Sequence, residues 1–355
     1  MSPYIPHSRP FLGQKEIDRV TAVIASGQIA RSHETAAFEN EFARWLSAPG
    51  AVAVSSGTAA LHLTLRAMAI GPGDEVIIPS YVCTALLNVV HYVGAAPIIA
   101  DVLPETGDID PDDVKKRLTP RTQAVIVPHL FGLPADMDAL LPLGPPIVED
   151  CAQAVGARCG GRLVGTMGHA AVFSFYATKV MTTGEGGMIV SDDQNLLSKA
   201  ADLTAYDNRR DYAVRYNYKM TDIQAAMGRV QLSRLSEMNR RRERIAKRYD
   251  AGVSESPIQA PPATPGRIYY RYAARVRGDL DAWIDGLSAR GVGCARPVFK
   301  PLHRYLGKTG RPGADAAWRT FLSLPVYPAL SDAESDHVLD ALRDVVAANS
   351  SIPTR

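Results

Sequence analysis

Short apolar runs alternate with helical patterns along residues 51–190. The first run, Ala51–Val54, reads Ala-Val-Ala-Val, and the helical pattern after it places Leu61 and Leu65 one turn apart. Uninterrupted apolar strands that alternate with helices predict a mostly parallel sheet with helices on both faces, and therefore an α/β fold. The expected strands are 51–54, 76–78, 97–100, 124–127, 147–148, 171–175 and 188–190, and the expected helices between them are 58–69, 85–93 and 114–118.

A longer helical pattern begins near Thr221 and precedes the C-terminal part of the chain. Residues 253–266 are rich in Pro and Ser and predict a connector. Because 355 residues suit one large domain plus a smaller one, we expect a large domain over residues 1–240 and a smaller C-terminal α+β domain over residues 241–355. The elements expected after the connector are a strand over 269–276 and helices over 280–290 and 332–346.

The composition and charge are those of a globular protein that has no polyanionic partner. Hydrophobic residues make up 46% of the chain, charged residues make up 21%, and the formal net charge is +2. The basic run Arg240–Arg242 is interpreted as a solvated helix face and not as a nucleic-acid patch. No apolar stretch is long enough to span a membrane, and the N-terminus lacks a signal-peptide pattern. We therefore expect a cytoplasmic protein without nucleic-acid or membrane partners.

The cysteines do not form a metal-binding pattern. No pair has CxxC spacing, and no histidine lies near a cysteine at the spacing of metal ligands. We expect reduced thiols and no metal site. The four residues concerned are Cys83, Cys151, Cys159 and Cys294.

The segment Ser55–Ala60 joins the first predicted strand to a helix and contains Gly57 followed by Thr58. A glycine turn ahead of a helix leaves backbone N–H groups free beside the positive end of the helix dipole, which suits a phosphate. An ordinary helix cap has the same sequence pattern, so this segment alone leaves both interpretations open.

An acidic pair, Glu149 and Asp150, ends the predicted strand 147–148. A carboxylate at the end of a buried strand is costly unless it has a partner. A protonated pyridine nitrogen is one such partner, because an aspartate beside it keeps the ring protonated as an electron sink. Gln153 could then bond a neighbouring ring substituent. The alternative is a carboxylate that caps the next helix.

Lys179 lies between the aromatic strand 171–175 and the glycine-rich turn Gly184–Gly187. A lysine in such a position is partly desolvated, and desolvation makes an amine nucleophilic. A plain surface lysine is the alternative for this residue type.

Taken in order, these motifs resemble the DegT/StrS-type family of pyridoxal-phosphate (PLP)-dependent sugar aminotransferases, which have the fold type I architecture. The resemblance covers most of the chain. The segments that carry it are 56–61 (Ser-Gly-Thr-Ala-Ala-Leu), 71–77, 129–132 (His-Leu-Phe-Gly), 149–153 (Glu-Asp-Cys-Ala-Gln), 173–179, 184–187, 216–226, 301–303 and 322–325.

The resemblance implies a role for each matching residue. Lys179 matches the lysine that carries PLP as a Schiff base, and Asp150 matches the partner of the ring nitrogen. Gln153 matches the contact to the ring hydroxyl, and Asn217 is similar to the asparagine that reaches the phosphate of a neighbouring subunit. The last match implies a homodimer with shared active sites. The residues that match phosphate ligands are Gly57, Thr58 and Ser174.

The chain departs from the family pattern at the ring-stacking and substrate positions. The aromatic residue that usually stacks on the cofactor ring aligns with Cys83, and Tyr81 lies two positions earlier. The usual arginine after Asn-Tyr is Lys219, which offers a point charge in place of a bidentate fork. The candidate substrate residues are Lys219, Arg296 and His303, and Arg209 and Arg210 are further candidates to compensate.

The function that the resemblance implies is transfer of an amino group from glutamate to a keto sugar, most simply a nucleotide-linked one. A cyclitol ketone is an alternative acceptor. Dehydratase relatives carry histidine at the lysine position, so Lys179 argues against that reaction. A non-catalytic regulator that binds PLP or a sugar nucleotide would be expected to lose Lys179 or Asp150, and both are present.

Overall fold

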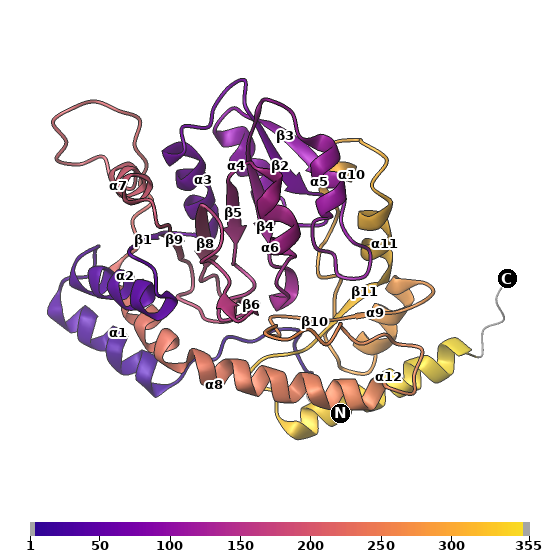
Figure 1. Cartoon of the computed structure of the whole chain (residues 1–355). Coiled ribbons are helices and arrows are strands. Elements are labelled where there is room, and N and C mark those ends of the chain that lie inside the picture. Colours follow the sequence, from indigo (N-terminus) through magenta and orange to yellow (C-terminus); the bar gives the residue numbers. More distant parts are fainter. Residues whose placement is uncertain (1–3, 351–355) are drawn as a thin grey trace.

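A seven-stranded sheet forms the centre of the protein (Figure 1). The structure is a computed structural model that describes residues 4–350. In spatial order the strands are β1 (Ala51–Val54), β9 (Gly187–Val190), β8 (Ala170–Ser174), β5 (Ile147–Asp150), β4 (Thr122–Pro128), β2 (Glu75–Pro79) and β3 (Ala96–Ala100). The last five run parallel, whereas β9 runs antiparallel between β8 and β1. The predicted mostly parallel α/β sheet is confirmed.

Helices cover both faces of the sheet. Successive side chains of each strand point to opposite faces, and the helices bury the apolar side chains on each of them. The helices concerned are α2 (His33–Leu46), α3 (Gly57–Ala67), α4 (Ala85–Tyr92), α5 (Pro111–Arg117), α6 (Met137–Leu140), α7 (Gln194–Leu203) and α8 (Asp222–Val253). On one face α3, α4 and α7 share a core with Val172 of β8. On the other face α2 and α8 pack around Phe173 of β8, while α5 and α6 pack on Val125 of β4.

The helix α8 links this core to a second core in the C-terminal part (Figure 1). It begins at the predicted cap, where the Gln224 amide donates to Thr221 Oγ1 and the Thr221 amide donates to Gln224 Oε1. Met238 of α8 belongs to the first core and Tyr249 to the second. The predicted domain boundary at residues 240/241 lies within this continuous helix and stays a prediction.

The second core forms around a two-stranded antiparallel sheet and also contains Ile5. The expected strand over 269–276 is confirmed only in part, because the strand comprises Tyr272–Arg275, and residues 269–271 and 276 lie outside it. The remaining elements are α1 (Gln14–Ser26), the hairpin β6 (Arg158–Cys159) and β7 (Arg162–Leu163), β10 (Tyr272–Arg275), α9 (Leu280–Ser288), α10 (Leu302–Tyr305), α11 (Pro312–Thr320), β11 (Phe321–Leu324), α12 (Asp332–Ser350) and the 3₁₀ turns η1 (Leu130–Gly132) and η2 (Leu141–Leu143).

The prediction of a solvated basic run at Arg240–Arg242 is wrong for its last residue. Arg240 is exposed, but Arg242 is 3% exposed and donates to the carbonyls of Tyr269, Tyr270 and Val326. Position 242 lies one turn after Met238, on the face of α8 that enters the second core. Burial lowers the pKa of the Arg242 guanidinium to about 10. The arginine therefore ties α8 to the chain on either side of the small sheet.

Across residues 4–350, none of the helices combines the length and the apolar character that crossing a membrane requires.

Candidate active site

A cavity of about 300 Å³ lies where β1, β5 and β8 end. The carboxyl ends of parallel strands are the usual ligand site of an open α/β sheet. The structure brings six of the predicted site residues together here, although they come from four separate segments. They are Gly57, Thr58, Cys83, Asp150, Ser174 and Lys179.

The N-terminus of α3 forms one end of this cavity. Ser56 caps the helix, since its Oγ accepts from the Ala59 amide and its carbonyl accepts from the Ala60 amide. The amides of Gly57 and Thr58 have no acceptor within the helix, because helix geometry provides none for the first turn. A Cβ on Gly57 would lie 2.7 Å from Ser174 Cβ, so glycine lets the Ser174 side chain approach the helix end. This end fits a phosphate.

Asp150 lies at the end of β5 and is 8% exposed. Burial raises the pKa of its carboxyl group, while a hydrogen bond of 3.0 Å from the Ala152 amide and the Lys179 amine act against the increase. A carboxylate in this position needs a cationic partner. A protonated ring nitrogen within the cavity would supply one, so the structure fits the pyridine of PLP as well as its phosphate.

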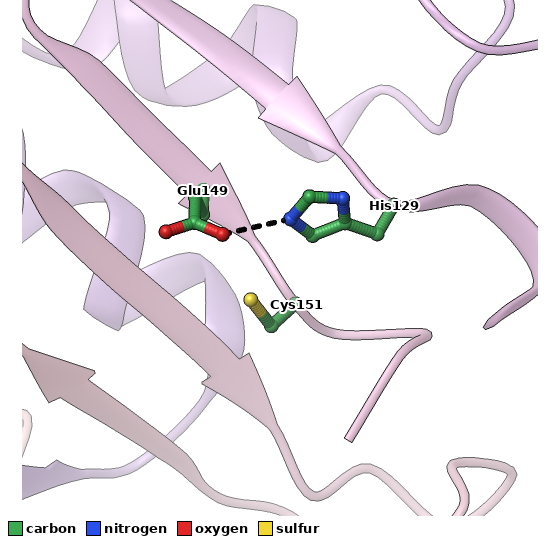
Figure 2. A group of neighbouring side chains, drawn as sticks. All are labelled: His129, Glu149 and Cys151. Carbon is green, nitrogen blue, oxygen red and sulfur yellow. Dashed lines mark hydrogen bonds and ion pairs between the residues drawn. The ribbon is translucent and has the colours of Figure 1, made fainter. Parts of the chain in front are cut away.

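Glu149 points to the opposite side of β5 and pairs with His129 at the end of β4 (Figure 2). The Ala135 amide donates to His129 Nδ1, so Nε2 carries the proton and donates to Glu149 Oε2 at 3.0 Å. The amides of Gly165, Met167 and Gly168 also donate to the Glu149 carboxylate. The net effect of burial, which opposes ionisation, and of these bonds is a lowered pKa for Glu149.

Cys151 lies beside this pair, and the three residues have the composition of a metal site (Figure 2). Hydrogen bonds already engage both oxygens of Glu149 and both ring nitrogens of His129. A metal ion would have to displace those bonds from a fully buried cluster. The cluster is therefore best explained as an anchor that fixes the end of β5 and the loop 165–168.

Lys179 follows β8, and its amide donates to the Tyr176 carbonyl at 2.9 Å. Its Nζ lies 5.1 Å from the centroid of the Tyr270 ring, and the Tyr270 hydroxyl lies 3.4 Å from Thr178 Oγ1. The sequence interpretation missed Tyr270, because it lies far from Lys179 in the chain and belongs to no motif. It also missed Tyr176 and Glu185, which line the cavity and flank Lys179 in the sequence.

Cys83 places a thiol at the position where the family usually has the aromatic residue that stacks on the cofactor ring. The side chain of Cys83 is exposed to the cavity. Desolvation by the protein around it and, to a smaller extent, the Asp150 carboxylate raise the pKa of its thiol. Tyr81 is fully buried and stacks on Phe321, so it does not replace the missing aromatic residue. Tyr176 is an aromatic residue that lines the cavity.

The structure places Gln153 and Asn217 outside the cavity lining. Gln153 Oε1 accepts from the Phe131 amide at 3.0 Å. The loop 205–215 projects from the body beyond α7 (Figure 1). Asn217 is exposed at the base of this loop, between Tyr216 and Tyr218, whose amides donate to the carbonyls of Leu203 and Thr204. Lys219 lies near that loop, with Nζ 3.7 Å from Asp207 Oδ2.

Arg296 and His303 also lie away from the cavity lining of this chain. Arg296 pairs with Asp281 and stacks 4.8 Å from the Trp318 ring, in a separate hollow of the C-terminal part. His303 is 2% exposed, with Nδ1 2.6 Å from Ser80 Oγ. The single chain therefore does not unite the candidate substrate residues with Lys179.

The sheet, the N-terminus of α3, the buried aspartate and the lysine are the features expected of a PLP-dependent aminotransferase of fold type I. The chain matches the model of the DegT/DnrJ/EryC1/StrS aminotransferase family over residues 10–343. It belongs to that family, and its cofactor is pyridoxal 5′-phosphate.

The relatives support the same class. The chain is 36% identical to the spore coat polysaccharide biosynthesis protein SpsC of Bacillus subtilis (strain 168), over 97% of each protein. The aminotransferase TlmJ from Streptoalloteichus hindustanus is also 36% identical, with a TM-score of 0.93 over 98% of this chain and 100% of TlmJ. Spr1654 from Streptococcus pneumoniae, named as a candidate sugar aminotransferase, is 29% identical. Its PLP form and its PMP form each give a TM-score of 0.91 over 97% of this chain and 99% of Spr1654.

Replacing the Glu149 anchor should destabilise the protein in a pH-dependent way. We expect Glu149→Gln to lower the free energy of unfolding by about 1–3 kcal/mol at pH 7, because buried N–H donors lose their acceptor. The folded pKa is below the unfolded value of about 4.3, so the carboxylate stabilises the fold fully above that pH. The gap between wild type and variant should shrink as pH falls through the folded pKa.

Urea unfolding between pH 7 and about pH 3 measures this gap, because the range must pass below the unfolded pKa of about 4.3. The matched control is Glu105→Gln, the same change at an exposed position, which should alter stability by no more than about 0.5 kcal/mol. An equal effect of the two substitutions at pH 7 would show that the Glu149 cluster does not anchor the strand.

Proposed function

We propose that this enzyme moves an amino group from glutamate to a nucleotide-linked keto sugar, with Lys179 and Asp150 as catalytic residues. The observation that carries the proposal is the single cavity in which a helix N-terminus, a buried carboxylate and a lysine amine meet. The sugar class is supported by the names of relatives, which include a polysaccharide biosynthesis protein and a candidate sugar aminotransferase.

Each residue of the cavity has a defined task in this proposal. The amides of Gly57 and Thr58 hold the phosphate of the cofactor together with the Ser174 hydroxyl. The Asp150 carboxylate keeps the ring nitrogen protonated, at a site where burial disfavours an unpaired charge. When bound, PLP supplies the aldehyde that reacts with amines and the ring that takes up electron density.

With PLP bound, the Lys179 amine would hold the cofactor covalently, and the amine of the donor would take its place and set it free. The free Lys179 amine then accepts the α proton of the donor and, in the second half of the cycle, returns a proton to the acceptor carbon. A positioned base of this kind contributes a factor of roughly 10²–10⁴ to the rate.

Removal of the Lys179 amine should abolish both turnover and covalent capture of PLP. We expect wild-type protein to be yellow, to bleach on addition of glutamate, and to retain PLP covalently after borohydride reduction. Lys179→Ala should show none of the covalent product by mass spectrometry. Lys199→Ala, at an exposed position on α7, should behave as wild type.

A Lys179→Ala enzyme that is active and insensitive to borohydride would refute the assignment. A wild-type protein that stays yellow with glutamate but turns over another amine would refute glutamate as the donor.

We further propose that two copies of the chain form a homodimer in which each contributes Asn217 to the cavity of the other. In the single chain the middle of the segment 204–218 projects from the body (Figure 1). Asn217 is exposed at the base of this segment and outside the cavity lining. The same segment exposes Tyr206, Tyr212 and Val214, with Tyr212 95% exposed. Exposed apolar side chains of this kind suit a protein interface.

If each site contains residues of both chains, a variant at Lys179 and a variant at Asn217 should complement each other when mixed. Lys179→Ala and Asn217→Ala should each be severely impaired alone, whereas a refolded equimolar mixture should regain about a quarter of wild-type activity, since half of the dimers would contain one native site. Steady-state rates of the mixture and of each variant provide the measurement. A mixture whose rate is only the average of the two variants would contradict shared sites.

A further inference from the structure

The backbone of Tyr270 is fixed by two elements that are distant in the sequence. Its amide donates to the Phe131 carbonyl at 3.2 Å, in the turn after β4. Its carbonyl accepts from the buried Arg242 guanidinium of α8 at 3.4 Å. The Phe131 amide of the same turn donates to Gln153, which lies outside the cavity lining. The backbone of Tyr270 is therefore fixed against the turn after β4 and against α8.

Two cations lie close to the ring of Tyr270, a residue that is 6% exposed. Lys179 Nζ lies 5.1 Å from the ring centroid, and the Arg271 guanidinium lies 4.7 Å from it. At the hydroxyl, Arg271 Nη2 donates at 3.3 Å and Thr178 Oγ1 lies at 3.4 Å. An aromatic ring attracts a cation to its face, most strongly where water is excluded.

The charges around the phenol distinguish it from the other buried tyrosines. Burial alone raises the pKa of a phenol, but Lys179, Arg271, the Thr178 hydroxyl and Arg242 outweigh burial and lower the pKa of Tyr270 to about 8. Tyr272, two positions later, donates to Asp250, and burial together with that carboxylate raises its pKa. Tyr270 thus lies where a phenol can become the counter-ion of a neighbouring amine.

Resting on the proposed role of Lys179, we propose that Tyr270 is a positioning residue that receives the lysine side chain whenever its amine is not bonded to the cofactor. The ring face and the ionisable hydroxyl hold the amine, including the ammonium form that exists after the amine has taken a proton. Lysine has a flexible four-carbon stem, so a fixed partner keeps the amine close to the reacting carbon. Thr178 and Arg271 in turn orient the phenol.

The direct test is the titration of Tyr270 in the cofactor-free protein. The 14 tyrosines can be labelled with ¹³C at Cζ, and the Tyr270 signal is the one that Tyr270→Phe removes. We expect this signal to titrate near pH 8 in wild type and to move to higher pH in Lys179→Ala, which removes a cation from the ring face. A signal that titrates near 10 and does not respond to Lys179→Ala would overturn the proposal.

A second readout separates positioning from folding. Tyr270→Phe keeps the ring, so it should load PLP and show full covalent capture by borohydride, but its single-turnover rate with the amino donor should fall about tenfold and depend differently on pH. Tyr269→Phe removes a hydroxyl from the adjacent buried position and should stay within about twofold of wild type. Equal rates for the two variants would overturn the proposal. Loss of covalent capture in wild type would refute the role of Lys179 instead, which distinguishes the two failures.

Discussion

The buried carboxylate of Asp150 is the constraint on which the rest of the site depends. It lies at the end of the central strand β5, where burial opposes its charge and raises its pKa. The Lys179 amine acts against this increase, and we propose that a protonated ring nitrogen of the cofactor is the further partner of Asp150. The N-terminus of α3 lines the same cavity and is the proposed phosphate site. In this proposal the charges of the cavity match those of PLP at both ends.

Buried hydrogen bonds around the cavity fix the positions of the elements that carry Asp150 and Lys179. The strand that presents Asp150 to the cavity turns Glu149 to the opposite side, where His129 and three backbone amides fix it. The turn that begins after His129 then binds the Tyr270 amide, and Arg242 binds the Tyr270 carbonyl. Two groups of buried hydrogen bonds, linked through the short chain segment 129–131, therefore connect the sheet, α8 and the C-terminal part.

Much of this arrangement could be predicted from the sequence. The strands of the central sheet were expected, because apolar runs and glycine turns are local signals. So were six helices, α3, α4, α5, α8, α9 and α12, whereas α1, α2, α6, α7, α10 and α11 were not. The six site residues of the cavity lie at or after strand ends or begin a helix, as expected. Tyr270 and the buried Arg242 escaped prediction, since their partners come from distant segments and long-range packing has no local signature. Asn217, Arg296 and His303 lie outside the cavity lining of the single chain, and their roles rest on the family resemblance. They stay predictions, as does the expected cytoplasmic location.

The most direct test of the central claim is a crystal structure of the purified enzyme with bound PLP. The account predicts continuous electron density from Lys179 Nζ to the cofactor, a ring nitrogen within hydrogen-bond distance of Asp150, and a phosphate on the amides of Gly57 and Thr58 beside Ser174. A cofactor attached to another lysine, or a phosphate bound away from the N-terminus of α3, would contradict it.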